Sequence, residues 1–235
     1  MTSRAQRGNP MTPASPAYVV FDCDGVLVDS EPLSIEVDRQ MLSELGWELS
    51  LAEIIERFIG RSHEHFLQEV TDHLGHPPPP GWDEASTPRY RAAYAHGLQP
   101  VAGIVEALDR ITLPSCVASS GTHDKMTFTL GLTGLLDRFE GRMFSATEVT
   151  RGKPAPDLFL HAANEMGWEP SSCVVVEDSP YGVDAALASG MRAIAYAGGV
   201  TKADRLARPG VTLITHMRDL PKAIVAMQAD ELATR

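Results

Sequence analysis

A short apolar run that ends in two acidic residues constrains this chain more than any other stretch. Residues 17–21 are apolar and β-prone, and Asp22 and Asp24 follow them, separated by Cys23. Such a run is typical of a strand buried on both faces of a parallel sheet, and open α/β sheets bind ligands at the carboxyl ends of such strands. Gly25 permits a sharp turn after the acids. The alternative is a plain strand end with an Asx turn.

Length and charge limit the classes of partner. The chain has 235 residues and a formal net charge of −11. The length suits one α/β domain with a smaller insertion, or two modest domains. Nucleic-acid backbones and anionic membrane surfaces need clustered lysine and arginine, so the charge argues against both. No apolar run approaches the ~20 residues that span a bilayer. We expect a small anionic partner bound by a local cation, and a protein that is a monomer or a weak dimer.

The three cysteines, Cys23, Cys116 and Cys173, fall on or beside expected strands without disulfide or zinc-site spacing. Buried, reduced thiols in the cytoplasm are the simplest explanation. The acidic neighbours of Cys23 disfavour its thiolate, which argues against a cysteine nucleophile. Residues 1–16 contain three prolines and no apolar centre, so they predict a disordered tail and not a signal peptide.

The pattern along the chain changes near residue 99. Apolar residues recur at helical spacing over 33–45, 51–58, 66–74 and 90–98, with a surface polyproline segment at 77–80. Strands and helices alternate afterwards. The change predicts an inserted α-helical cap domain, residues 32–98, in a core made of residues 17–31 and 99–235.

Short apolar runs predict the remaining strands of the core. They lie at 116–118, 143–145, 173–176, 191–196 and 211–214 and alternate with helical patterns at 104–111, 126–132, 158–166, 183–187 and 220–227. Such alternation predicts an α/β fold, a Rossmann-like doubly wound parallel sheet. The helix after 173–176 has Ser179 as its expected N-cap, Pro180 at its first position and Gly190 at its end.

Polar groups recur where these strands end. Ser119 follows one strand, Lys153 lies in a loop, and Glu177 and Asp178 follow another strand. Each alone has an ordinary explanation, as a turn serine, a solvated lysine or charge at a helix N-terminus. Right-handed crossovers, however, bring the carboxyl ends of parallel strands to one edge of the sheet. We therefore expect these groups to converge with Asp22.

A cluster of carboxylates needs a cation. Two unit charges 4 Å apart repel by roughly 4 kcal/mol at an effective dielectric of 20. Oxygen ligands from Asp22, Glu177 and Asp178 point to Mg²⁺. Mg²⁺, the Lys153 ammonium and a serine hydroxyl together suit a phosphoryl group. Asp22 would then attack phosphorus to form an aspartyl-phosphate, and Asp24 would exchange the protons.

Four motifs occur in order: F-D-C-D-G-V-L-V-D-S-E-P, V-A-S-S-G, G-K-P-A-P-D and V-V-V-E-D-S-P-Y-G-V-D-A-A. Together they resemble the haloacid dehalogenase superfamily of hydrolases, in its β-phosphoglucomutase-like branch with a helical cap, over residues 17 to about 200. The resemblance implies that Asp22 is the nucleophile. It implies that Asp24 is the acid/base and, through its backbone carbonyl, a metal ligand.

The same resemblance implies roles for the later motifs. The hydroxyl of Ser119 binds phosphate, with the amides of Ser120 and Gly121 nearby. Lys153 is the cation beside phosphate and nucleophile. Asp178 is a metal ligand, and Glu177 is the second metal ligand beside it.

Two positions narrow the choice among the activities of the superfamily. Halide leaves unprotonated, so Asp24 favours phosphoryl chemistry over dehalogenation. The cap histidine of β-phosphoglucomutases, twelve residues after the nucleophile, is Ser34 here, which puts mutase activity in doubt. The chain looks more like the bacterial sugar-phosphate phosphatases, the 6-phosphogluconate phosphatases among them. These share the R-F-x-G cap loop, here ending at Gly60, and the following Arg61 is a candidate substrate ligand, ahead of His63.

The sequence therefore predicts a Mg²⁺-dependent phosphatase that hydrolyses a small phosphomonoester, with a sugar phosphate as the expected substrate. Two alternatives stay open. One is a phosphomutase of the β-phosphoglucomutase type. The other is a catalytically inactive sugar-phosphate sensor or a protein adaptor, because a fold alone does not fix function.

Overall fold

The computed structural model describes residues 15–59, 61 and 63–232, and within them six parallel strands form one sheet in the order β3-β2-β1-β4-β5-β6. The strands are β1 (Tyr18–Phe21), β2 (Ser115–Ser119), β3 (Met143–Ser145), β4 (Cys173–Glu177), β5 (Arg192–Tyr196) and β6 (Thr212–Ile214). The order reverses direction at β1, between β2 and β4. In doubly wound sheets ligands bind at such a switch point, outside the carboxyl ends of the strands. The predicted fold class is confirmed.

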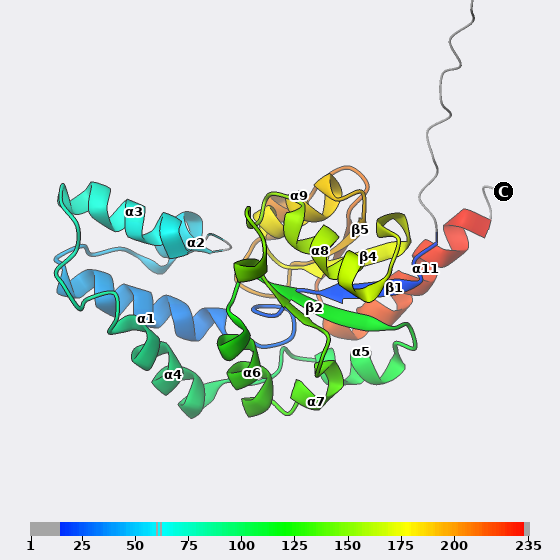
Figure 1. Cartoon of the computed structure of the whole chain (residues 1–235), viewed down its shortest axis with the longest axis horizontal. Coiled ribbons are helices and arrows are strands. Elements are labelled where there is room, and N and C mark those ends of the chain that lie inside the picture. Colours follow the sequence, from blue (N-terminus) through cyan, green and yellow to red (C-terminus); the bar gives the residue numbers. More distant parts are fainter. Residues whose placement is uncertain (1–14, 60, 62, 233–235) are drawn as a thin grey trace, which may run out of the picture.

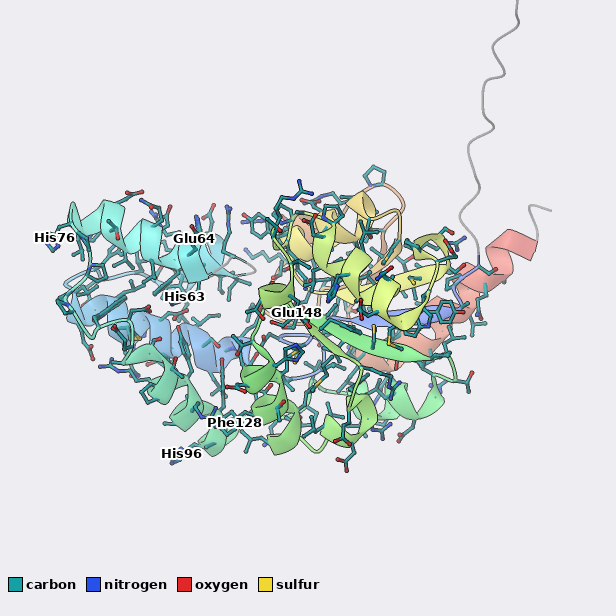
Figure 2. All side chains as sticks on the ribbon, in the orientation of Figure 1. His63, Glu64, His76, His96, Phe128 and Glu148 are labelled. Atoms are coloured by element: carbon teal, nitrogen blue, oxygen red, sulfur yellow. The ribbon has the colours of Figure 1, made fainter. Side chains whose placement is uncertain are left out.

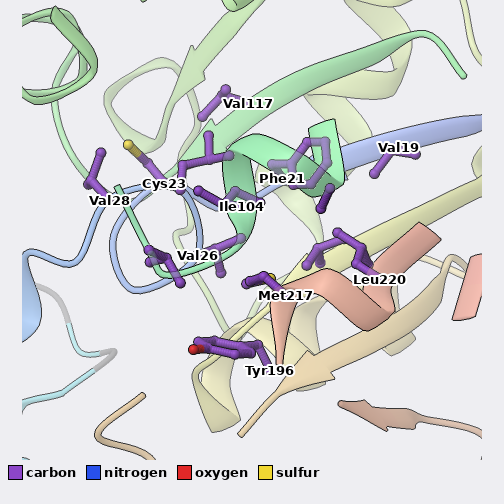
Figure 3. Close-up of a cluster of buried hydrophobic side chains, with 14 of the residues drawn as sticks. Val19, Phe21, Cys23, Val26, Val28, Ile104, Val117, Tyr196, Met217 and Leu220 are labelled. Atoms are coloured by element: carbon purple, nitrogen blue, oxygen red, sulfur yellow. The ribbon is translucent and has the colours of Figure 1, made fainter. Parts of the chain in front are cut away.

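Alternate residues of the strands face opposite layers of helices. Val19 and Phe21 of β1 belong to an apolar cluster that also contains Ile104, Met126, Phe139 and Leu220. Val20 belongs to a second cluster on the opposite face, which also contains Leu158 and Ala185. Both faces of the central strands are therefore covered, which explains their continuous apolar sequence. Figure 3 shows the first cluster, to which the loop after β1 contributes Val26 and Val28 and the chain after the cap contributes Ile104.

The helices that follow the cap surround this sheet (Figure 1). They are α5 (Ile104–Arg110), α6 (His123–Leu132), α7 (Leu136–Phe139), α8 (Asp157–Met166), α9 (Pro180–Ala188), α10 (Ala203–Leu206) and α11 (Leu220–Leu232), with 3-10 turns at Ala146–Glu148, Pro170–Ser172 and Met217–Asp219. The expected start of α9 is present, since the hydroxyl of Ser179 accepts a hydrogen bond from the amide of Gly182 at 3.0 Å.

In the described part of the segment between β1 and β2, four helices form a separate lobe beside the core (Figure 1). They are α1 (Glu31–Glu44), α2 (Leu51–Phe58), α3 (His63–Leu74) and α4 (Ser86–Gly97). The lobe has an apolar cluster of its own, in which Trp47 contacts Phe58 and Phe66 stacks on Trp82. We call this lobe the cap. Its helical character is as expected, and its predicted limits at residues 32 and 98 stay a prediction.

Two details differ from expectation. The four-residue helices α7 and α10 were not anticipated, because one turn is too short to show a helical period. Pro16, expected in the tail, is instead bound to α11, where the side-chain amide of Gln228 donates to its carbonyl at 2.8 Å. Residues 1–14 lie outside the described part of the chain. Among the described residues, no helix is both long enough and apolar enough to cross a membrane.

Candidate active site

The strand ends that carry the two acidic pairs, Asp22 with Asp24 and Glu177 with Asp178, lie side by side at the centre of the sheet edge. Phe21 pairs with Val176, so the strand ends that carry Asp22 and Glu177 are adjacent. The amide of Asp22 donates to the carbonyl of Val176 at 3.0 Å, which fixes the backbone at this point. Asp22 and Glu177 are buried, as expected for residues that leave the central strands of a covered sheet. The predicted convergence of these strand ends is present.

Lys153 supplies the local cation. Its ammonium lies 2.5 Å from Oδ1 of Asp22 and 2.7 Å from Oε1 of Glu177, and it donates to the carbonyl of Ala118 at 3.3 Å. The Lys153 side chain is only 3% exposed. Burial would lower its pKa, but the two carboxylates outweigh burial and the pKa is raised. Lys153 therefore remains charged, and it offsets part of the repulsion among the acids.

Glu177 also orders the loop that carries Asp178. Its Oε2 accepts hydrogen bonds from the amides of Asp178 and Ser179, both at 2.8 Å, and from the hydroxyl of Ser179 at 2.9 Å. This close packing requires a glycine in the helix that follows. A Cβ on Gly182 would lie 1.7 Å from Oε1 of Glu177. The sequence motif thus has a steric basis.

Three carboxylates lie close enough together to hold a metal ion. Asp22, Glu177 and Asp178 each offer an oxygen, and these oxygens all lie within 4.8 Å of one another. Oδ2 of Asp178 is buried and has no hydrogen-bond partner among the described residues. An unpaired buried carboxylate oxygen is costly unless a cation or water satisfies it. The donor set is all oxygen, which fits Mg²⁺.

Electrostatics at the cluster point the same way. Burial raises the pKa of Asp22 to about 7; Lys153 opposes the rise, and Glu177 and Asp24 add to it. Burial likewise raises the pKa of Asp178 and of the neighbouring Glu31. A divalent cation beside these carboxyls would favour their ionised forms and so oppose the rise in pKa.

Asp24 has two well-defined partners. The hydroxyl of Ser30 donates to its Oδ1 at 2.6 Å, and the ammonium of Lys125 lies 2.8 Å from its Oδ2. Burial would raise the pKa of Asp24, but the Lys125 charge and these hydrogen bonds outweigh burial and the pKa is lowered. Asp24 is therefore a carboxylate in the resting protein.

The loop after β2 approaches the same place. Ser119 is buried, and its hydroxyl accepts from the amide of Gly121 at 3.0 Å. A Cβ on Gly121 would lie 3.4 Å from that hydroxyl and 3.7 Å from Oδ2 of Asp24. The hydroxyl of Ser145 at the end of β3 donates to the Gly121 carbonyl at 2.8 Å and secures the loop. Ser120 is exposed beside Ser119.

The cap contributes less than the core. Gly60 lies outside the described residues. The Arg61 guanidinium lies over the ring of Tyr181, 4.1 Å from the ring centre, so it reaches the core three residues beyond Asp178. His63 instead pairs with Asp83 inside the cap at 2.9 Å. Figure 2 shows His63 within the cap lobe, at the start of α3.

Lys125, Glu31 and Gly182 were not among the residues singled out from the sequence. Lys125 lies two residues inside α6, and its only sequence signal is its place in the first turn of the helix after Ser119. Glu31 begins α1 directly after the acidic loop. In contrast, Cys23 is as expected. It is buried and unpaired, and burial raises its pKa well above the usual range, with Asp24 and Asp22 adding to the rise.

Comparison with known proteins agrees with this geometry. The family described as haloacid dehalogenase-like hydrolase matches residues 19–196. The chain belongs to the haloacid dehalogenase-like hydrolases. It is 33% identical over 208 residues to the 6-phosphogluconate phosphatase of Escherichia coli, a match that covers 87% of this chain and 92% of that protein. Its relatives include named phosphatases, so this chain is a phosphoric monoester hydrolase, and the predicted enzyme class is confirmed.

Two solved structures of haloacid dehalogenase-like proteins resemble the chain. One, from Agrobacterium tumefaciens, is described as of unknown function; it has 36% identity and a TM-score of 0.81, covering 91% of this chain and 99% of that one. The other, a hydrolase from Deinococcus radiodurans with bound phosphate and sodium, has 30% identity and a TM-score of 0.74, covering 91% and 97%.

Proposed function

We propose that this phosphatase hydrolyses a sugar phosphate in two steps, through an aspartyl-phosphate on Asp22, with Mg²⁺ as cofactor. The observation that carries the proposal is the Lys153 ammonium placed between Asp22 and Glu177, at 2.5 and 2.7 Å, beside the unpaired oxygen of Asp178. A nucleophilic carboxylate can approach an anionic phosphate only where positive charge is already fixed in place.

In the first step a carboxylate oxygen of Asp22 attacks phosphorus. The bond between phosphorus and the ester oxygen breaks. Asp24, which is ionised in the resting protein and must first take up a proton from solvent, transfers that proton to the departing alcohol. Lys153 and the hydroxyl of Ser119 contact the phosphoryl oxygens, where negative charge must be stabilised.

In the second step water attacks the phosphorus of the aspartyl-phosphate. Asp24, now a carboxylate, accepts a proton from the water as the new oxygen–phosphorus bond forms. The bond between phosphorus and the Asp22 oxygen breaks, and inorganic phosphate leaves. The ionised state of Asp24 in the resting protein is the state that this second step requires.

Asp22, Asp178, Glu177 and the Asp24 carbonyl would hold Mg²⁺. When bound, Mg²⁺ neutralises charge on the phosphoryl group and on the acids around it. The support in this chain is the all-oxygen donor set and the buried, unpaired Asp178 oxygen.

The proposed substrate class rests on relatives and on the cap. The 6-phosphogluconate phosphatase to which the chain is similar acts, by its name, on a phosphorylated sugar acid. Arg61, an exposed cation that reaches the core at Tyr181, is the proposed ligand for a polar or anionic group of the sugar. The absence of a histidine at Ser34, whose hydroxyl instead lies 2.7 Å from that of Tyr94, favours transfer to water over transfer to a second sugar hydroxyl.

Phosphate release tests the proposal directly. Purified protein with Mg²⁺ should release inorganic phosphate from several members of a sugar-phosphate panel, and chelation should stop the release reversibly. Asp22→Asn should lower kcat by at least about 10³-fold, because the amide cannot attack phosphorus. Asp72→Asn is the matched control, since Asp72 is an exposed cap residue bonded to Gln68.

Three results would count against the proposal. An Asp22→Asn variant with near wild-type activity would exclude the nucleophile. Faster formation of glucose 6-phosphate than of free phosphate, from β-glucose 1-phosphate with a bisphosphate activator, would indicate a mutase. Tight binding of one sugar phosphate without release of phosphate from any would indicate a sensor.

A further inference from the structure

Lys125 is a half-buried cation that the mechanism above does not use. It lies in the first turn of α6, where Thr122 caps the helix by accepting from the Lys125 amide at 3.2 Å. Its side chain leaves the helix toward the sheet edge, and its ammonium is 2.8 Å from Oδ2 of Asp24. The Lys125 side chain is 36% exposed and that of Asp24 is 24% exposed. An ion pair shielded to this degree is worth more than one on the open surface.

Ser30 and Lys125 each bind one oxygen of the Asp24 carboxylate. Ser30 donates to Oδ1 at 2.6 Å and Lys125 to Oδ2 at 2.8 Å, so rotation of the carboxylate would break one of the two bonds. A carboxylate has about four lone-pair sites, so two remain for a water or an alcohol. Oδ2 also lies beside Gly121, in the loop of the phosphate-binding Ser119. The oxygen that Lys125 orients thus lies beside the loop that carries Ser119.

The same lysine also contacts the cap. Its ammonium lies 5.9 Å from the ring centre of Tyr94 in α4, within the range of a cation–π contact. The Tyr94 hydroxyl lies 2.7 Å from that of Ser34 in α1. Lys125 therefore joins the core carboxylate to the two cap helices that approach the site.

We propose that Lys125 is a positioning residue of the phosphatase reaction: it orients the Asp24 carboxylate for proton transfer and ties that orientation to the cap through Tyr94. This inference rests on the proposed function. The step most sensitive to it is the second, in which Asp24 must face the water that attacks the aspartyl-phosphate. A misplaced Asp24 slows this step, and the phosphoenzyme accumulates.

The test compares Lys125→Met with Lys125→Arg and with Lys222→Met, a control at an exposed lysine of α11. With p-nitrophenyl phosphate, whose leaving group needs no proton, Lys125→Met should lose about 10- to 100-fold in kcat with KM within about threefold. Acid quenching should recover more covalent phosphate on Lys125→Met than on the wild type. Lys125→Arg should regain most of kcat, and Lys222→Met should match the wild type.

A double-variant cycle separates positioning from a general loss of structure. If Lys125 acts through Asp24, then Asp24→Asn with Lys125→Met should be no slower than Asp24→Asn alone, within about threefold. The inference would be overturned if the loss of kcat in the double variant equalled the product of the two single-variant losses. A kcat of Lys125→Met within twofold of the wild type, or a loss without phosphoenzyme that Lys125→Arg does not rescue, would also overturn it.

Circular dichroism and thermal melting accompany each variant. If Lys125→Met does not fold, Lys125→Gln, which keeps a hydrogen-bond donor without the charge, provides the same readouts against the same criteria. Failure of the proposed function is recognisable separately, because the wild type would then release no phosphate; that result would also overturn the inference.

Discussion

Gly182 sets how closely Glu177 approaches the start of α9. The Glu177 carboxylate occupies the space where a side chain at position 182 would begin, 1.7 Å from the position of a Cβ. Glu177 in turn bonds the Asp178 and Ser179 amides and Lys153, so it has little freedom to move aside. A single methyl group here therefore acts on the loop of Glu177 and Asp178, the proposed metal-binding loop, as well as on local packing.

Gly182→Ala should unfold more easily than the wild type by about 1–3 kcal/mol and should bind Mg²⁺ more weakly, because Glu177 must shift. Gly131→Ala is the matched control: Gly131 is also helical, in α6, and its Cβ would meet only Leu136 at 4.0 Å. The control should gain up to about 1 kcal/mol from helix propensity. Urea unfolding and calorimetric Mg²⁺ titration measure both effects; equal behaviour of the two variants would contradict the steric explanation.

Asp22, Lys153 and Asp178 could be predicted because each follows a recognisable strand or motif, and parallel topology brings such ends together. Lys125 and Glu31 could not, since a charged residue inside a helix has the same sequence signature whether it faces solvent or an active site. Their roles depend on the direction of α6 and α1 relative to the sheet edge, which only the folded chain shows.

At the scale of elements, the cap depends on the pairing of α1 with α4. Asp38 of α1 is buried and accepts a short hydrogen bond from the Tyr90 hydroxyl of α4. Burial raises the pKa of Asp38 to about 6, although the bond from Tyr90 opposes the rise. In the folded protein, the Asp38 carboxyl therefore holds its proton more tightly than it does in the unfolded chain.

The sign of the pH effect follows. Because the folded-state pKa of Asp38, about 6, exceeds the ordinary aspartate value of 3.8, this group stabilises the fold fully below pH 4, and the contribution is lost as pH rises through 6. The loss amounts to at most about 3 kcal/mol. Asp38→Asn keeps an acceptor for Tyr90 without the titration, so its stability relative to the wild type should be greater at pH 7.5 than at pH 5. Urea unfolding at both pH values checks this, and a constant difference would refute it.

The same scale shows what helical periodicity can and cannot predict. The four cap helices match apolar residues at helical spacing. The six strands match short apolar runs between turn residues. The four-residue helices α7 and α10 have no such period, and their positions follow from packing: Phe139 of α7 lies against Phe21, and Leu206 of α10 is buried against α9 and β5.

For the whole molecule, Arg61 marks where the cap meets the core. Its guanidinium covers Tyr181 near the metal-binding loop, and this contact joins residues far apart in sequence. Arg61→Ala should raise KM for the sugar phosphate by about 10-fold or more with little change in kcat, since a lost charge-assisted contact is worth about 1.5–3 kcal/mol. Steady-state kinetics measure this.

Arg57→Ala provides the comparison, because Arg57 is an exposed cap arginine whose partner is Glu69, within the cap. It should leave KM unchanged. Equal effects of both changes would show that cap stability, and not a contact at Arg61, determines substrate binding. A change in kcat alone for Arg61→Ala would place this residue outside substrate recognition.

The distance along the chain between Asp22 and its cation has a consequence for synthesis. Lys153 follows Asp22 by 131 positions, and the strand that delivers Glu177 and Asp178 comes later still. A growing polypeptide therefore exposes Asp22, the proposed nucleophile, on the ribosome long before the groups proposed to activate it have been translated. Because β1 is a central strand that needs both β2 and β4 as neighbours, reactivity and the completed sheet should arise together, and prematurely terminated chains should be inert toward cellular phosphate esters.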